Sequence, residues 1–449
     1  MSSDLTTGPV GGHLRRQASA FSLGLVAIFS FEAVNLFFVS MLGDAPLAAV
    51  SFTLPVIWLI YGFGIGFEAG TASVVSRAIG RRDEAYARRL ATHSAMLATL
   101  TLGGLCVVGL NTIDPVFRRL GATPELMPMI HDYMSVWYWV APSDACFWTC
   151  LAALRARGNA QLEARLISLA AVLNLVLDPI FIFGLFGFPR LEVQGAALAS
   201  LVSNLSVLGI TLLYVAGRLK IMATPFAPLR DIVASWRHML TIGIPAMITN
   251  TIIPLSSAIV VSMLAVYGVD AVAGFGVAAR IEPFALLVFY SLSAVCSPFF
   301  GQNFGAGQHQ RLIEARRLIT RFCLVYGVFL TLSMDLLVRP VSGLFSESES
   351  IRVVAVHYIW LVSWGYGAHG VVMSMNSAFN GTGRPLPAVV ISSARVIFLF
   401  LPLAWLGRWL LGLEGIFLAS STANVLLAVL AYYWLGRHIR SHEPPVLSG

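Results

Sequence analysis

The chain has 449 residues, of which 57% are apolar and only 11% charged, and its mean hydropathy is +0.79. Because a soluble domain carries roughly 25% charged residues, this composition excludes a soluble globular protein and indicates a chain embedded in a lipid bilayer. The formal net charge of +7 is explained by basic loops on one side of a membrane and indicates no nucleic-acid partner.

Twelve apolar segments are each long enough to cross the ~30 Å of hydrocarbon in a bilayer. A helix satisfies its own backbone in lipid, so we predict an all-α polytopic membrane protein with twelve transmembrane helices. In chain order they cover residues 18–42, 47–76, 90–110, 128–154, 164–185, 195–216, 239–267, 271–300, 318–338, 353–379, 387–407 and 415–436.

The basic residues are unevenly distributed between the two sets of predicted loops. With the N-terminus in the cytoplasm, 21 of the 29 Lys and Arg residues lie on the cytoplasmic side, in agreement with the positive-inside rule. We therefore expect a multi-pass protein of a bacterial-type inner membrane with both termini in the cytoplasm.

The chain contains an internal repeat. The Gly-x-x-Leu-Ala-Ser pattern of residues 195–200, followed by Asn204, recurs at 415–420, followed by Asn424, and two shorter echoes keep the same order. A repeat read in the same direction predicts two homologous six-helix lobes related by a pseudo-two-fold axis along the membrane normal, an arrangement typical of transporters. The expected domains are a cytoplasmic tail 1–16, an N-lobe 17–216, a linker 217–237, a C-lobe 238–436 and a cytoplasmic tail 437–449.

Polar side chains inside the predicted helices mark candidate functional sites, because an ionised group costs about 2.5–3.5 kcal/mol in the middle of a bilayer. Asn174 and Asp178 are four residues apart and share one helix face. Asp178 lies roughly 10 Å from the outer end of its helix at ~1.5 Å per residue, and Asn35 and Ser200 lie at a similar depth. We predict that these groups form a cation-coupling site in the first lobe.

The second lobe carries different charges at mid-depth. Glu282 and Arg395 are predicted to pair across two helices, because an unpaired buried charge is strongly unfavourable, with a cation or substrate role as the alternative. Aromatic and thioether side chains could bind planar, lipophilic cations by stacking and cation–π contacts, although such side chains also serve as packing. With Glu282 and Arg395, the candidate substrate-cleft residues are Trp58, Tyr61, Phe284 and Met373.

No sequence motif supports catalysis. The five cysteines lack metal-ligand spacing, and there is no nucleotide-binding loop or nucleophile elbow. We therefore expect no enzyme activity, no bound metal and no cofactor, and energy drawn from an ion gradient.

Three stretches together resemble the multidrug and toxic compound extrusion (MATE) family: residues 37–89, residues 174–179 with 195–200, and residues 279–282 leading into 301–307. The resemblance extends over roughly residues 15–436 and is strongest to the DinF-like branch. It implies a monomeric antiporter that exports lipophilic, often cationic drugs by alternating access, coupled to H+, with Na+ as the alternative ion. It also assigns Asn174, Asp178 and Ser200 to the polar cation-coupling cluster.

The chain departs from the DinF-like pattern at Asn35. That branch has a carboxylate eight residues before the glycine that is Gly43 here, and an asparagine cannot titrate. Either Asp178 acts together with Glu32, one turn from Asn35, or Asn35 is an engineered mimic of a protonated aspartate. Two other functions stay open: a flippase for lipids or lipid-linked precursors from the same superfamily, and an ion channel.

Overall fold

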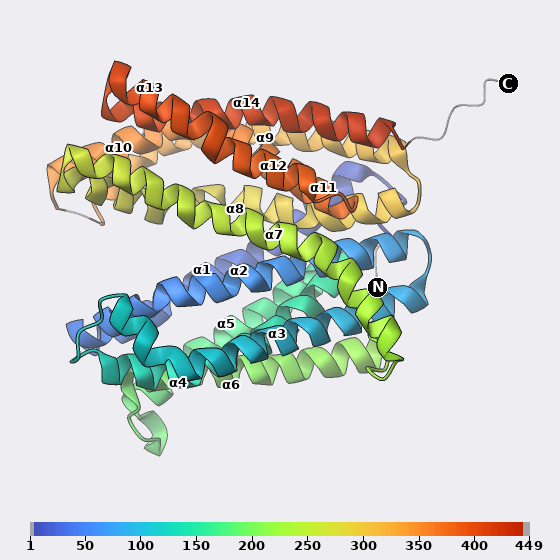
Figure 1. Ribbon diagram of the computed structural model, residues 1–449, viewed down its shortest axis with the longest axis horizontal. Helices are drawn as coiled ribbons and strands as arrows, with labels where there is room; N and C mark the ends of the chain where they lie inside the picture. The colour runs from blue at the N-terminus through green and yellow to red at the C-terminus, as the bar shows by residue number, and fades with distance from the viewer. Residues whose placement is uncertain (1–3, 346, 443–449) are drawn as a thin grey trace. The chain divides into compact units, whose positions relative to one another are not determined.

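A computed structural model describes residues 4–345 and 347–442, except for the side chains of 253–255. Every regular element in this part of the chain is helical (Figure 1). The first half contains α1 (Val10–Ser40), α2 (Asp44–Gly80), α3 (Glu84–Arg119), α4 (Met127–Ala156), α5 (Ala160–Phe183) and α6 (Glu192–Leu212) with a π-helical end, η2 (Leu213–Arg218). The second half contains α7 (Leu229–Leu264), α8 (Val269–Gly305), α9 (His309–Ser342), α10 (Glu349–Ser363), α11 (Tyr366–Gly381), α12 (Leu386–Ala394), η4 (Arg395–Phe400), α13 (Leu401–Leu411) and α14 (Leu413–Arg440).

These helices account for the twelve predicted transmembrane segments. Within the described residues, ten helical stretches are long and apolar enough to cross a membrane. The other two predicted segments correspond to α4 and to α10 followed by α11. The prediction of an all-α polytopic protein is therefore confirmed.

The predicted helix 353–379 is interrupted rather than continuous, because α10 ends at Ser363 and α11 begins at Tyr366. A break in a helix leaves carbonyl groups without their usual partners, and hydroxyl groups from neighbouring helices supply them. Ser421 on α14 donates to the carbonyls of Leu361 (2.6 Å) and Val362 (3.1 Å), and Thr331 on α9 donates to that of Ser363 (2.9 Å).

Polar turn residues define where other helices begin and end. The Asp83 carboxylate accepts a hydrogen bond from the Tyr86 N–H (2.9 Å) at the start of α3, and the Asn159 side chain accepts one from the Leu162 N–H (3.3 Å) at the start of α5. Gly184 ends α5 in the left-handed region, with φ 72°. These caps satisfy backbone groups at the helix ends.

The described chain packs as two compact units. The N unit contains Ala20–Met247, and the C unit contains Leu5–Ser19 and the described residues from 248 onward. In the N unit α4 packs against α2, α3 and α6, and α5 packs against α6; in the C unit α8 and α14 both pack against α11 (Figure 1). The division falls inside α1 and α7, so each of these helices contributes to both units.

The start of the chain belongs to the C unit because polar groups there bind its backbone. The Leu5 N–H donates to the Gln302 side chain (3.0 Å), and the Asn303 amide donates to the Leu5 carbonyl (3.1 Å). Arg311 donates to the carbonyls of Leu5 (3.0 Å) and Gly8 (2.6 Å). The segment that precedes α1 is thereby fixed to α8 and α9.

The repeated glycines permit the close approach of neighbouring helices. A Cβ atom on Gly195 would overlap the Phe181 carbonyl of α5, and one on Gly415 would overlap the Gly407 carbonyl of α13. Both copies of the repeat therefore open with a residue that lets backbone contact backbone, as glycine does in helix packing within membranes.

Candidate functional site

The centre of the candidate site in the N unit is Asp178 on α5, which is fully buried. The side-chain nitrogen of Asn35 on α1 donates to both carboxylate oxygens, at 3.2 and 3.4 Å. A carboxylate only accepts hydrogen bonds, so it requires donors on its other sides as well. Asn35 and Asp178, 143 residues apart in sequence, are thus brought into contact.

Asn174 connects Asp178 to α6. In the amide orientation that satisfies both of its neighbours, the nitrogen donates to the Asp178 carboxylate, at 2.9 and 3.2 Å. In this orientation its oxygen accepts from the backbone N–H and the hydroxyl of Ser200, both at 3.1 Å, and from the Ser203 hydroxyl at 3.3 Å. Ser203 was not among the predicted residues, although its position three residues after Ser200 places it on the same helix face.

The surroundings of Asp178 are polar but carry no opposite charge. Among the ion pairs formed by residues that the structure describes, none includes Asp178. The carboxylate is stabilised by the two amide groups alone, which hydrogen-bond to the charged form. Such a group can accept a proton without first breaking an ion pair.

Glu32 does not join this cluster by direct contact. It lies on α1 one turn before Asn35 and is exposed at the surface of the N unit. Glu32 interacts electrostatically with the phenol of Tyr61 on α2. The structure therefore separates Glu32 from the four predicted residues that it brings together.

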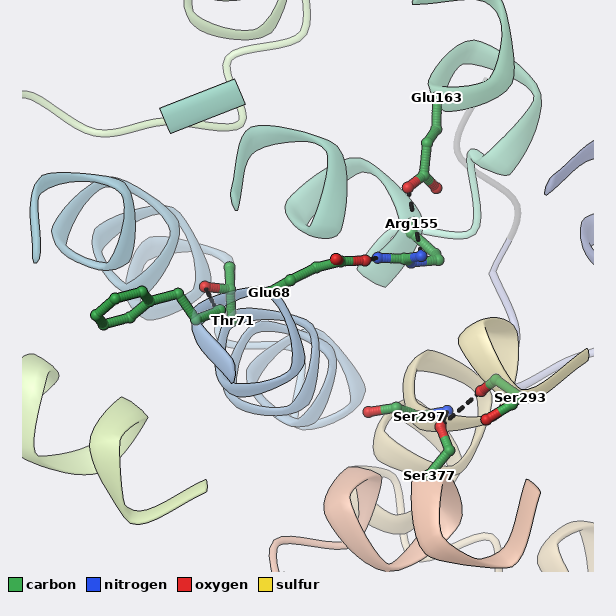
Figure 2. A network of polar contacts seen from close by, with 8 residues as sticks. Glu68, Thr71, Arg155, Glu163, Ser293, Ser297 and Ser377 are labelled. Carbon is green, nitrogen blue, oxygen red and sulfur yellow. Dashed lines mark hydrogen bonds and ion pairs between the residues drawn. The ribbon is translucent and has the colours of Figure 1, made fainter. Parts of the chain in front are cut away.

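A second ionic cluster in the N unit was not predicted (Figure 2). The Arg155 guanidinium on α4 pairs with the carboxylates of Glu68 on α2 and, at 3.4 Å, Glu163 on α5. Arg155 and Glu163 are almost completely buried, and the Arg155 guanidinium also lies over the Phe21 ring, 4.7 Å from its centroid. Arg155 directly follows the predicted transmembrane helix 128–154, and no sequence spacing links it to Glu68 or Glu163.

In the C unit Glu282 and Arg395 lie within electrostatic range of each other. The ion pairs between described residues do not include this pair. Arg395 contacts His369 Nδ1 at 3.2 Å, and Glu282 accepts a hydrogen bond from the Tyr358 hydroxyl at 3.4 Å. Arg395 is the first residue of the π-helical turn η4, and π turns inside helices are frequent at functional sites.

Serine hydroxyls form hydrogen bonds between α8 and α11 in this unit (Figure 2). The Ser377 hydroxyl donates to the Ser293 carbonyl at 2.6 Å and accepts from the Ser297 N–H at 3.1 Å. The Ser293 hydroxyl in turn donates to the carbonyl of Met373, one of the candidate cleft residues, at 3.1 Å. These neutral bonds fix the position of Met373 on α11.

The aromatic candidates are partly accessible. Trp58 and Phe284 are 56% and 59% exposed. In the N unit Tyr61 lies edge-on to both Trp58 and Trp137, with ring centroids 5.9 Å apart in each case. Trp137 is buried, so the aromatic surface that could stack on a planar molecule consists of Trp58 and the partly buried Tyr61.

Similarity to known proteins identifies the family to which this chain belongs. A family model described as MatE matches residues 20–180 and 245–406, which together cover most of both units. The chain therefore belongs to the MATE family and is a polytopic membrane transporter, not an enzyme.

Individual relatives are similar over nearly the whole chain. The FAD transporter of Shewanella oneidensis is 35% identical over 429 residues, which cover 96% of this chain and 95% of the relative. The multidrug export protein MepA of Staphylococcus aureus is 24% identical over 412 residues, covering 91% of this chain and 90% of the relative.

Solved structures show the same fold in two six-helix lobes. A crystal structure of the MATE transporter VcmN of Vibrio cholerae, in a mutant with asparagine in place of an aspartate, has a TM-score of 0.90 and 29% identity, and the alignment covers 96% of this chain and 97% of that one. The bent form of VcmN gives a TM-score of 0.91 with 28% identity, covering 96% and 98%.

The Arg155 cluster allows a prediction about stability. Replacing Arg155 with glutamine leaves the buried Glu163 and the partly buried Glu68 without their cation, so we expect a loss of about 3–5 kcal/mol in the free energy of unfolding. Arg157→Gln is the matched control, because its ion pair with the half-exposed Glu84 is worth less than about 1 kcal/mol. Thermal unfolding of both variants in detergent would measure the difference; equal midpoints would show that the cluster does not stabilise the N unit.

Proposed function

We propose that this chain is an H+-coupled antiporter that exports an organic solute from the cytoplasm by alternating access. The supporting observation is the setting of Asp178, a fully buried carboxyl group held by the amides of Asn35 and Asn174. The carboxyl group can bind a proton as a neutral acid or release it as a hydrogen-bonded carboxylate. A coupling site needs both states.

The same geometry favours a proton over Na+ as the coupling ion. Amide N–H groups of Asn35 and Asn174 face the carboxylate oxygens, and an N–H group donates hydrogen bonds but cannot be a metal ligand. A sodium ion at Asp178 would require both amides to turn their oxygens inward. A proton requires only one of the two amides to turn its oxygen toward the new O–H group.

Coupling follows from a difference between lobe conformations. A proton gradient contributes ~1.4 kcal/mol per pH unit, and this energy is usable only if protonation of Asp178 favours one conformation and deprotonation another. In this mechanism both termini lie in the cytoplasm of a bacterial cell, as the distribution of basic residues predicts. The monomer is the working unit.

For the solute we propose a planar, lipophilic organic cation. The aromatic surface of Trp58 and Tyr61 supports this choice, since aromatic rings attract cations through their faces. Glu32 lies within electrostatic range of Tyr61 and would add negative charge beside the rings.

A flavin dinucleotide is the second candidate solute. It is favoured by the 35% identity to a relative named as an FAD transporter. The guanidinium of Arg395, which contacts His369, would suit the phosphates of such a molecule. The aromatic surface would be compatible with its flavin ring.

Transport by inside-out vesicles distinguishes the two solutes. With an imposed pH gradient, we expect uptake of ethidium by the parent protein and little change in the Arg395→Gln variant. If FAD is the solute, FAD uptake should exceed that of ethidium and should fall at least tenfold in Arg395→Gln, because the phosphates lose their guanidinium partner. If the vesicles take up neither ethidium nor FAD, both solute assignments are wrong.

Asp178→Asn should abolish gradient-driven transport. The variant keeps the shape of the side chain but cannot exchange a proton, so we expect at least a tenfold loss of uptake with an unchanged thermal unfolding midpoint. Asp114→Asn, at an exposed position on α3, is the control and should retain transport. Normal pH-driven uptake by Asp178→Asn would remove Asp178 from the coupling mechanism.

Asn35→Asp should increase transport and change its pH dependence. Two carboxylates at the distance seen between Asn35 and Asp178 (3.2 Å) cannot easily ionise together, so the variant should hold a shared proton that is released at high pH. Uptake rates measured from acid to alkaline pH in both proteins test this. Identical rates and pH profiles would show that Asn35 is only a hydrogen-bonding partner.

A further inference from the structure

Asp144 is a buried carboxyl group that the proposed function leaves unused. It lies in the middle of α4 and is only 6% exposed. Its side chain hydrogen-bonds to Asn204 on α6, and no ion pair between residues that the structure describes includes it. A buried carboxylate without a cation is costly, whereas a protonated carboxyl both donates and accepts and so matches an amide.

The internal repeat places a second titratable side chain at the corresponding position of the C unit. Residues 133–158 and 358–383 align at an offset of 225, which pairs Tyr133 with Tyr358, Trp139 with Trp364, and Gly158 with Gly383. Both of these glycines have positive φ, 73° and 82°, so the two segments also end in the same way.

At this offset Asp144 corresponds to His369. Asn204 hydrogen-bonds to Asp144, and Asn424 lies near His369. These two asparagines are the equivalent residues of the repeated Gly-x-x-Leu-Ala-Ser motif. Each unit therefore places one titratable side chain near the same motif asparagine.

Two phenols interact electrostatically with Asp144 and Asp178. Tyr61 on α2 is within electrostatic range of both Asp144 and Tyr133, and Tyr133 on α4 is within range of Asp178. Tyr133 is 8% exposed. A hydroxyl group can accept one proton while it donates another, so the order carboxyl, phenol, phenol, carboxyl is suited to proton movement.

The remaining charged groups around Asp144 do not neutralise it. From α1, Glu32 is within range of Tyr61 and is itself acidic. The charged residues of α3 lie within two turns of its ends, away from the level of Asp144. From α5 the acidic Asp178 faces Tyr133, and from α6 the group that faces Asp144 is the neutral Asn204.

We propose that Asp144 is a second proton-binding carboxyl group of the N unit, positioned by Asn204 and linked through Tyr61 and Tyr133 to Asp178. The inference rests on the proposed proton coupling and gives the chain the second exchangeable carboxyl that Asn35 cannot provide. Protonation forms one O–H bond on Asp144 and breaks one on a hydronium ion or on the neighbouring carboxyl group, so no further reactant is needed.

Infrared difference spectroscopy of the whole protein in nanodiscs tests the proton site without transport. A pH jump should remove the carbonyl band of a protonated carboxyl group in the parent protein. This band should lose one component in Asp144→Asn, a different component in Asp178→Asn, and both in the double variant. Asn204→Ala should displace the Asp144 component without removing it. A spectrum of Asp144→Asn equal to that of the parent protein would overturn the proposal.

Transport by the same variants tests the role in coupling. With a pH gradient we expect at least a tenfold loss of uptake in Asp144→Asn and partial recovery in Asp144→Glu, which restores an exchangeable proton. Asp132→Asn is the control, since Asp132 is exposed on the same helix; its uptake and spectrum should be unchanged. The glutamate variant also covers the case in which Asp144→Asn fails to fold.

The two proposals can fail separately. If uptake by the parent protein does not respond to a pH gradient, proton coupling is wrong, even where the spectrum shows that Asp144 titrates. If the parent protein is driven by the gradient and Asp144→Asn keeps the same rate and pH profile, the role of Asp144 is overturned while proton coupling through Asp178 stands.

Discussion

The free-energy cost of holding charge away from water governs the polar interior of both units. The N unit meets this cost in two ways. The Arg155 guanidinium is placed between Glu68 and Glu163, so opposite charges neutralise one another. Asp178 is instead held by neutral amides. The first arrangement resists any change of charge, whereas the second tolerates gain or loss of a proton.

The two units use the same backbone pattern for different chemistry. Each copy of the repeat opens with a glycine in close helix contact and ends with an asparagine near a titratable side chain, Asp144 in one unit and His369 in the other. The acids are concentrated in the N unit, while in the C unit His369 contacts Arg395. A duplicated scaffold has thus kept its packing positions while its charged positions have diverged.

Much of the polar cluster could be expected from helix geometry. Asn174 and Asp178 share a helix face at a spacing of four residues, and depth along their helices brought Asn35 and Ser200 to the same level. The Arg155 cluster was missed because its acids lie on other helices, where no sequence spacing links them. Glu282 and Arg395 lie within electrostatic range of each other, as their charges predict, while their hydrogen bonds go to Tyr358 and His369.

The sequence by itself determined the membrane class, the number of spans, the repeat and the family, because hydropathy and periodicity are local properties that add along the chain. Only the tertiary structure decided which residues meet across helices, where α10 and α11 separate, and which buried acids stand without a cation. These depend on helix rotation and on contacts between residues more than a hundred positions apart, such as Asn35 with Asp178. A single sequence specifies the depth of a side chain but not the partner that it faces.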